Sequence, residues 1–265
     1  MRYAPDMVLI IPSIPIVHGL CGAQIALLAH EARHAELEIY SQSPVDRARL
    51  LRKENAKMIH LEFLDRDPWD DECLCLIREI REAVDIPIGV SLADSPHTES
   101  ECTLLFDAGI HRIFLPREME ELQFLHYCGL FTSRKIIPKV NPSFDFETKF
   151  SEYRTRGVER IGVEISGSDA LEMGTLDWDR LEAMTCAARS AGIRLTAFHG
   201  VRGYPDLKRL QELGPALDSL ILCRALNENR FPCQLIWREV EAVAALEENP
   251  ASNLWSNPLE GKPHI

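Results

Sequence analysis

The chain alternates between short apolar runs and longer segments in which apolar residues recur every three or four positions. Short apolar runs are typical of strands covered on both faces, and the second pattern is typical of helices that bury one side. The apolar runs predict eight strands, at residues 8–14, 58–64, 86–92, 113–115, 136–140, 161–165, 193–198 and 217–222. Helices are predicted between and after them, at residues 43–55, 70–84, 95–108, 118–129, 144–156, 176–191, 204–213 and 232–247.

Two of the predicted helices begin with recognisable capping residues. Ser43 stands before Pro44, and Ser95 stands before Pro96. Serine accepts hydrogen bonds from first-turn amides, and proline fits the first helical position. Residues 18–42 make an unusually long connection, which we expect to be an exposed polar helix or hairpin that folds over the ends of the strands.

The element order predicts an α/β fold, a (β/α)8 TIM barrel, because parallel strands joined by helices need crossover connections. A doubly wound open sheet has the same alternation and is the alternative. The strand count favours the barrel, and we expect residues 1–248 to form this single domain and residues 249–265 a C-terminal tail. The segment Ile86–Arg117 matches Ile193–Arg224 in length and element order, which predicts a half-barrel internal repeat.

Composition narrows the classes of partner. The formal net charge of −12 argues against a nucleic-acid or anionic membrane surface, because those partners need a basic face. It leaves room for a phosphorylated small molecule, which needs only a local positive site. Pro12 and Pro15 interrupt the apolar N-terminal run, which we interpret as a strand rather than a signal peptide.

The eight cysteines are scattered and form no metal-binding pattern. We interpret them as reduced core residues of a cytoplasmic protein.

Two turns between strand and helix near the end of the chain suit phosphate. Glycine lets backbone N–H groups approach an anion, a helix N-terminus adds donors and positive charge, and arginine offers a bidentate fork. The predicted phosphate-binding residues are Gly200, Arg202, Cys223 and Arg224. The corresponding turn in the first half, residues 91–94, holds a leucine and an aspartate in place of the glycines, so one anion site should be much stronger than the other.

Barrel chemistry takes place at the carboxyl ends of the strands, so the polar residues there are the catalytic candidates: Lys139, Asn141, Glu164 and His199. Lys139 and Glu164 are costly to bury unless paired, and they come from adjacent predicted strands. They form either a buried ion pair or, with His199 as a further partner, a proton-transfer site. A Schiff base on Lys139 has no supporting spacing. The other polar residues expected at this end are His60, Glu62, Asp65, Ser91, Asp94, Arg117 and Ser166.

Residues 30–34 fit the zinc-protease pattern H-E-x-x-H. The segment falls in the long connection after the first strand, and no third ligand has suitable spacing. We therefore expect no metal and no cofactor.

Three segments carry a family resemblance: IIPSIPIVHG near the start, IYSQSPVDRARLLRKENAKMIHLEFLD at residues 39–65, and LILCRALNENRF near residue 224. They resemble the phosphoribosyl isomerase of histidine biosynthesis (HisA) and its sister cyclase (HisF), both half-repeat barrels. The resemblance covers residues 8–247 and implies this fold, with a phosphate site after the seventh and eighth strands. It also implies an Amadori rearrangement between two aspartates, but the matching positions here are Pro15 and Asn141, which cannot exchange a proton at neutral pH.

Together these features predict a divergent isomerase-like barrel that binds a phosphorylated small metabolite. Its reaction would be isomerase- or lyase-type proton transfer other than the ancestral Amadori isomerisation. The alternative is a non-catalytic relative that acts as a ligand sensor or as a subunit of a complex. In that case the long connection and the tail would contact a protein partner or a second copy of the chain.

Overall fold

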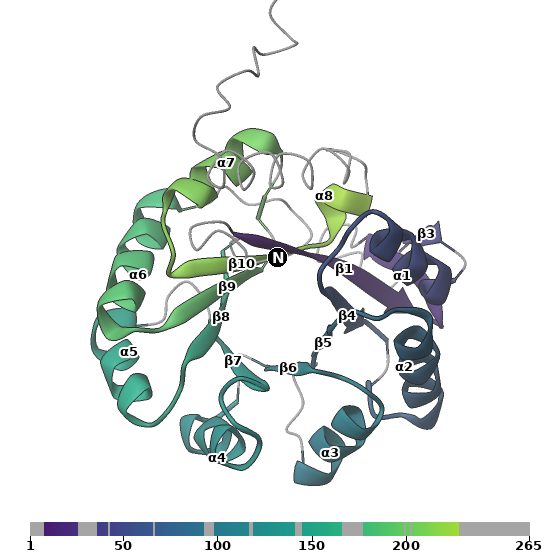
Figure 1. Ribbon diagram of the computed structural model, residues 1–265, viewed down its shortest axis with the longest axis horizontal. Coiled ribbons are helices and arrows are strands. Elements are labelled where there is room, and N and C mark those ends of the chain that lie inside the picture. The colour runs from purple at the N-terminus through teal and green to yellow at the C-terminus, as the bar shows by residue number, and fades with distance from the viewer. Residues whose placement is uncertain are drawn as a thin grey trace, which may run out of the picture.

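The computed structural model describes residues 8–25, 36–41, 43–65, 67–92, 98–116, 119–140, 145–165, 177–198, 200–201 and 203–227. The structure contains eight parallel strands arranged in a ring (Figure 1). They are β1 (Leu9–Val17), β4 (Ile59–Phe63), β5 (Ile88–Ser91), β6 (Arg112–Leu115), β7 (Ile136–Val140), β8 (Arg160–Glu164), β9 (Arg194–Phe198) and β10 (Leu217–Leu222). Since β1 pairs in parallel with both β4 and β10, the ring is closed. The (β/α)8 barrel is therefore confirmed and the open sheet is excluded.

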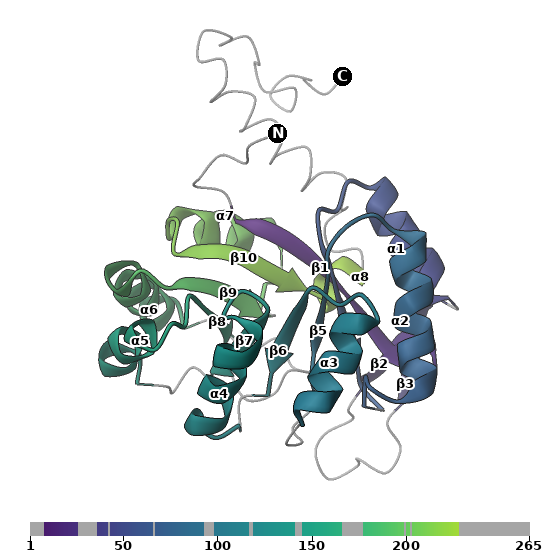
Figure 2. The ribbon, with the colours of Figure 1, turned by 60° about the horizontal axis from the view of Figure 1, so that its bottom comes forward.

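Helices cover the outside of this ring (Figures 1 and 2). They are α1 (Pro44–Lys53), α2 (Asp71–Ala83), α3 (Glu99–Asp107), α4 (Glu121–Phe131), α5 (Phe146–Thr155), α6 (Trp178–Ala191), α7 (Tyr204–Glu212) and the short α8 (Arg224–Asn227). In the described ranges, no helix has the length and apolar character needed to cross a membrane. The helix predicted at 232–247 and the tail lie outside the described residues.

The helix starts depend on capping, and one of them was predicted wrongly. Ser43 caps α1 as expected, accepting the backbone N–H of Asp46 at 3.1 Å. Helix α3 starts later than predicted, because its N-cap is Thr98 rather than Ser95. Thr98 and Glu101 form a reciprocal capping box, with the Thr98 N–H donating to Glu101 Oε2 at 2.7 Å.

The long connection after β1 contains a hairpin, one of the two predicted forms. Strands β2 (Leu20–Ile25) and β3 (Glu36–Ser41) pair in antiparallel fashion, and β2 also pairs with the end of β1. The turn between β1 and β2 places His18 at φ 51° and Gly19 at φ 74°. Two successive positive φ angles are typical of tight hairpin turns. The H-E-x-x-H segment lies outside the described residues.

The centre of the barrel is filled by three rings. His60, Phe114 and Phe198 meet edge to face, with centroids 5.0–5.8 Å apart. Two glycines make room for them: a Cβ on Gly89 would lie 3.3 Å from both His60 and Phe114, and one on Gly162 would lie 2.9 Å from Phe198. This cluster separates the two ends of the barrel interior.

The described cysteines form no disulfide, but they are not all core residues. Cys75 and Cys186 are exposed, which corrects the expectation from the sequence. Burial raises the pKa of the Cys102 and Cys128 thiols to about 12, so these two are unreactive at neutral pH.

Candidate active site at the carboxyl end of the barrel

Alternation along the strands decides which side chains enter the barrel. Ile137 of β7 and Phe198 of β9 belong to the cluster inside the ring. Successive strand residues point to opposite faces, so Lys139, two residues beyond Ile137, points inward as well. Gly162 of β8 contacts Phe198, which places Glu164 on the same inner face. The two charged residues therefore share the mouth of the barrel.

None of the ion pairs found among the described residues joins Lys139 to Glu164. The Lys139 ammonium lies 5.8 Å from the centroid of the Phe198 ring, a cation–π contact. In the strand register Lys139 is level with Gly162, so Glu164 stands about 6.6 Å further along the strand at about 3.3 Å per residue. Both side chains are half-buried and are held at different heights.

The turn after β9 contains two glycines whose backbone the structure describes, Gly200 and Gly203. Gly200 has φ 77°, a left-handed conformation that favours glycine. Gly203, the N-cap residue of α7, has no side chain with which to cap the helix. The amino end of α7 therefore faces this turn without a capping group of its own.

The turn after β10 lies beside it, because β9 and β10 are paired neighbours. Cys223 is half-buried there, and Arg224 is the first residue of α8. The structure thus brings Gly200, Cys223 and the Arg224 backbone to adjacent strand ends. Asn141, His199 and Arg202 lie outside the described residues, and of Arg224 only the backbone is described.

Two buried serines add polar groups inside the barrel, where Ser13 pairs with His60 and Ser91 pairs with Phe114 in the strand register. Ser13 of β1 is 3% exposed and Ser91 of β5 is 6% exposed. Among the described residues neither hydroxyl has a hydrogen-bond partner. Such orphaned hydroxyls are uncommon in native interiors and are often satisfied by water or a ligand. The sequence analysis named Ser91 and missed Ser13, whose signal is a polar residue within the run IIPSIPIV.

Asp65 has a structural role outside the interior of the barrel. Its Oδ2 accepts the backbone N–H of His18 at 2.7 Å and lies 2.7 Å from His18 Nδ1. The pair borders a small cavity of about 80 Å³ against α2. Asp65 therefore fixes the β1–β2 turn.

Comparison with known proteins identifies the family. No family model matches the chain. A protein of Pelodictyon phaeoclathratiforme is 31% identical over 271 residues, which cover 91% of this chain and 97% of that protein. A protein of Chloroherpeton thalassium is 30% identical over 260 residues, covering 91% and 95%, and one of Salinibacter ruber is 28% identical over 250 residues, covering 87% and 93%. All three are named 1-(5-phosphoribosyl)-5-((5-phosphoribosylamino)methylideneamino)imidazole-4-carboxamide isomerase. The chain belongs to this family of phosphoribosyl isomerases.

Proposed function

We propose that this barrel binds a phosphorylated small metabolite at the ends of β9 and β10 and catalyses a proton transfer there. The reaction is of the isomerase or lyase type and differs from the Amadori isomerisation. The names of the relatives describe a substrate with two phosphoribosyl groups, which supports a phosphorylated ligand.

The phosphate half of the proposal rests on the turn at Gly200. Gly200 has φ 77°, and the uncapped amino end of α7 follows it. Backbone N–H groups in such a turn can donate hydrogen bonds to a bound anion. Arg224 and Arg202 supply guanidinium groups to the same ligand, and Cys223 contributes its backbone. The first-half turn holds Leu92, which is 2% exposed, so the proposed ligand carries a single strongly bound phosphate.

The proton-transfer half rests on one observation: Lys139 and Glu164 both face into the mouth, from adjacent strands and at different heights. Glu164 serves as the general base, with His199 or Lys139 as the acid and Asn141 as a hydrogen-bond donor. By the family resemblance, Pro15 stands where one of the two aspartates is expected, and its side chain offers no proton. The chemistry therefore differs from that of the named relatives.

Thermal shift with triose, ribose and ribulose phosphates tests the binding step, since a ligand specific for the folded state raises the melting temperature. The Arg224→Ala variant is expected to lose the shift.

The proton-transfer step is tested with the sugar phosphate that raises the melting temperature, by measuring its turnover and its uptake of deuterium from the solvent. Glu164→Gln is expected to retain binding and to lose about 10²- to 10⁴-fold in kcat. Glu182→Gln, on the exposed face of α6, is the matched control and keeps the wild-type rate. Binding with no turnover in the wild type would instead favour the ligand sensor, and a Glu164→Gln rate equal to that of the wild type would refute the assignment of the base.

A further inference from the structure

The opposite end of the barrel carries an arginine-lined pocket. Arg112, Arg160 and Arg194 are the first residues of β6, β8 and β9, so they mark the amino ends of the strands. Arg134, before β7, and Arg154, at the end of α5, complete the lining of a cavity of about 500 Å³. This volume falls within the range of small-molecule sites. The pocket is strongly basic in a chain whose net charge is −12.

One carboxylate of the pocket serves two exposed arginines. Glu159 Oε2 lies 3.3 Å from Arg134 Nε, and Glu159 Oε1 lies 3.9 Å from Arg154 Nη1. The three side chains are 43–82% exposed. Pairs of this kind contribute little stability, and their guanidinium groups can reorient toward a stronger anion.

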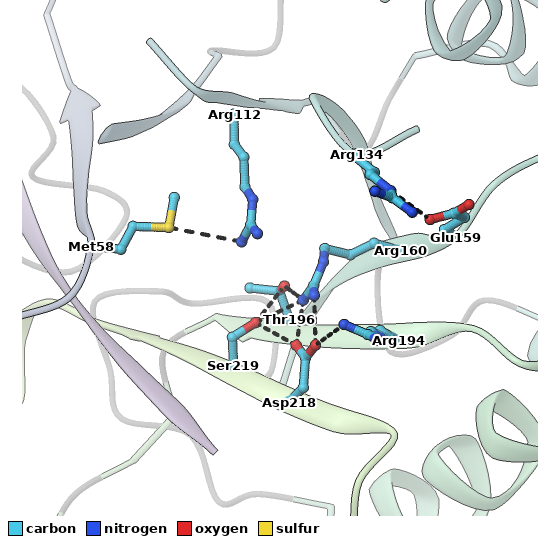
Figure 3. A network of polar contacts seen from close by, with 9 residues as sticks. All are labelled: Met58, Arg112, Arg134, Glu159, Arg160, Arg194, Thr196, Asp218 and Ser219. Atoms are coloured by element: carbon cyan, nitrogen blue, oxygen red, sulfur yellow. Dashed lines mark hydrogen bonds and ion pairs between the residues drawn. The ribbon is translucent and has the colours of Figure 1, made fainter. Parts of the chain in front are cut away.

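The second carboxylate, Asp218, is held deeper (Figure 3). It accepts hydrogen bonds from both terminal nitrogens of Arg160, which also donates to Thr196 and Ser219 at 3.0 Å. Asp218 Oδ2 also lies 3.7 Å from Arg194 Nη1. Two carboxylates thus face five arginines, which leaves an excess of three positive charges.

Arg112 has no carboxylate partner among the residues that the structure describes. Its Nη1 lies 3.8 Å from the Met58 sulfur, a weak acceptor, as Figure 3 shows. Burial lowers the pKa of this half-buried guanidinium, and so do the charges of Arg160 and Arg194, while the charge of Asp218 acts in the opposite direction. A partly desolvated cation that lies beside two others and forms no direct ion pair among the described residues is unfavourable.

We propose that this pocket is a second ligand site, which binds a phosphorylated small molecule carrying at least two negative charges. All its basic groups are arginines, whose planar forks match phosphate oxygens, and the nearly buried Ser133 adds a hydroxyl to the lining. A concave site suits a small molecule better than a macromolecular surface. The ring cluster of His60, Phe114 and Phe198 lies between this pocket and the mouth, so a ligand here would be a second molecule, separate from the one proposed at Gly200.

Isothermal titration with pyrophosphate tests the site. Arg134→Ala/Arg194→Ala removes two side chains that are 82% and 69% exposed, so the fold is preserved. This double variant is expected to bind at least about tenfold more weakly than the wild type, since each lost charge-assisted hydrogen bond is worth about that factor. Arg49→Ala/Arg78→Ala removes the same charge from exposed positions elsewhere and is expected to bind like the wild type. Arg224→Ala, altered at the mouth, is also expected to bind normally.

Three results would overturn the proposal. They are a wild-type protein that does not bind pyrophosphate, a double variant that binds as tightly as the wild type, and a loss of binding in Arg224→Ala. Citrate distinguishes phosphate from carboxylate ligands, and equal or tighter binding of citrate would overturn the assignment of a phosphorylated ligand.

Arg112→Met supplies an independent check. It is expected to weaken pyrophosphate binding at least about tenfold without lowering the melting temperature of the unliganded protein, because it replaces a partly desolvated cation, which forms no direct ion pair among the described residues, by an apolar chain. A lower melting temperature would show that Arg112 supports the fold instead of a ligand.

Discussion

Asp218→Asn gives the sharpest test of the energetics at the amino end of the barrel. The carboxylate accepts two hydrogen bonds from Arg160, whose side chain is only 10% exposed, and one from Ser219 Oγ at 2.9 Å. Removing one partner of a buried ion pair costs about 3–5 kcal/mol, because the remaining charge is left without compensation. Asparagine keeps one acceptor and Asp218 is 24% exposed, so we expect a loss near the lower limit, about 3 kcal/mol.

Urea unfolding followed by circular dichroism measures this loss. With a denaturant slope of about 3 kcal/mol per molar, as expected for a large domain, the midpoint falls by about 1 M. Arg194→Ala is the control, because its ion pair with the same carboxylate is 3.7 Å long and its side chain is 69% exposed. It is expected to cost less than about 1 kcal/mol. If Asp218→Asn cost no more than Arg194→Ala, the argument for a buried pair would be refuted.

Two further predictions concern packing and pH. Gly162→Ala is expected to lower the free energy of unfolding by about 1–3 kcal/mol, because the new Cβ would lie 2.9 Å from Phe198. Gly129→Ala in α4 is the control: its Cβ would meet nothing within 4 Å, so the variant should raise the free energy of unfolding by up to about 1 kcal/mol. Equal urea midpoints for the two variants would contradict this prediction. His111 Nδ1 accepts the Ile88 N–H at 3.2 Å, and burial and Arg81 lower the pKa of this imidazole. Near the unfolded-state pKa of about 6.5 the unfolded protein binds more protons at His111 than the folded protein does, so stability should fall as the pH drops through that value. His111→Gln should make the urea midpoint less dependent on pH in this range.

The sequence was sufficient for the barrel, because continuous apolar runs mark strands buried on both faces. The run Ile136–Val140 coincides with β7, and the predicted helix at residues 204–213 differs from α7 by one residue. The start of α3 was missed because Ser95-Pro96 is a plausible cap, while Thr98 and Glu101 form a stronger reciprocal one. Local capping signals compete, and the sequence alone does not rank them.

The site was harder to predict, because contacts between side chains of neighbouring strands depend on how far along the barrel axis each residue lies. Lys139 and Glu164 lie on neighbouring strands, but the register that separates them appears only in the structure. The arginine pocket was not predicted, because the chemistry of such barrels is expected at the carboxyl ends of the strands. Its signal is present: an arginine precedes the apolar residues of three strands, in RIFL, RIGVE and RLTAF.

Strand β8 shows how one barrel accommodates two different ends. Its inward residues are Arg160, Gly162 and Glu164, so a cation, an empty position and an acid follow one another within about 13 Å. Gly162 lacks a side chain because Phe198 occupies that space. The ring cluster fills the middle of the barrel, so the acid at one end of β8 is kept apart from the cation at the other.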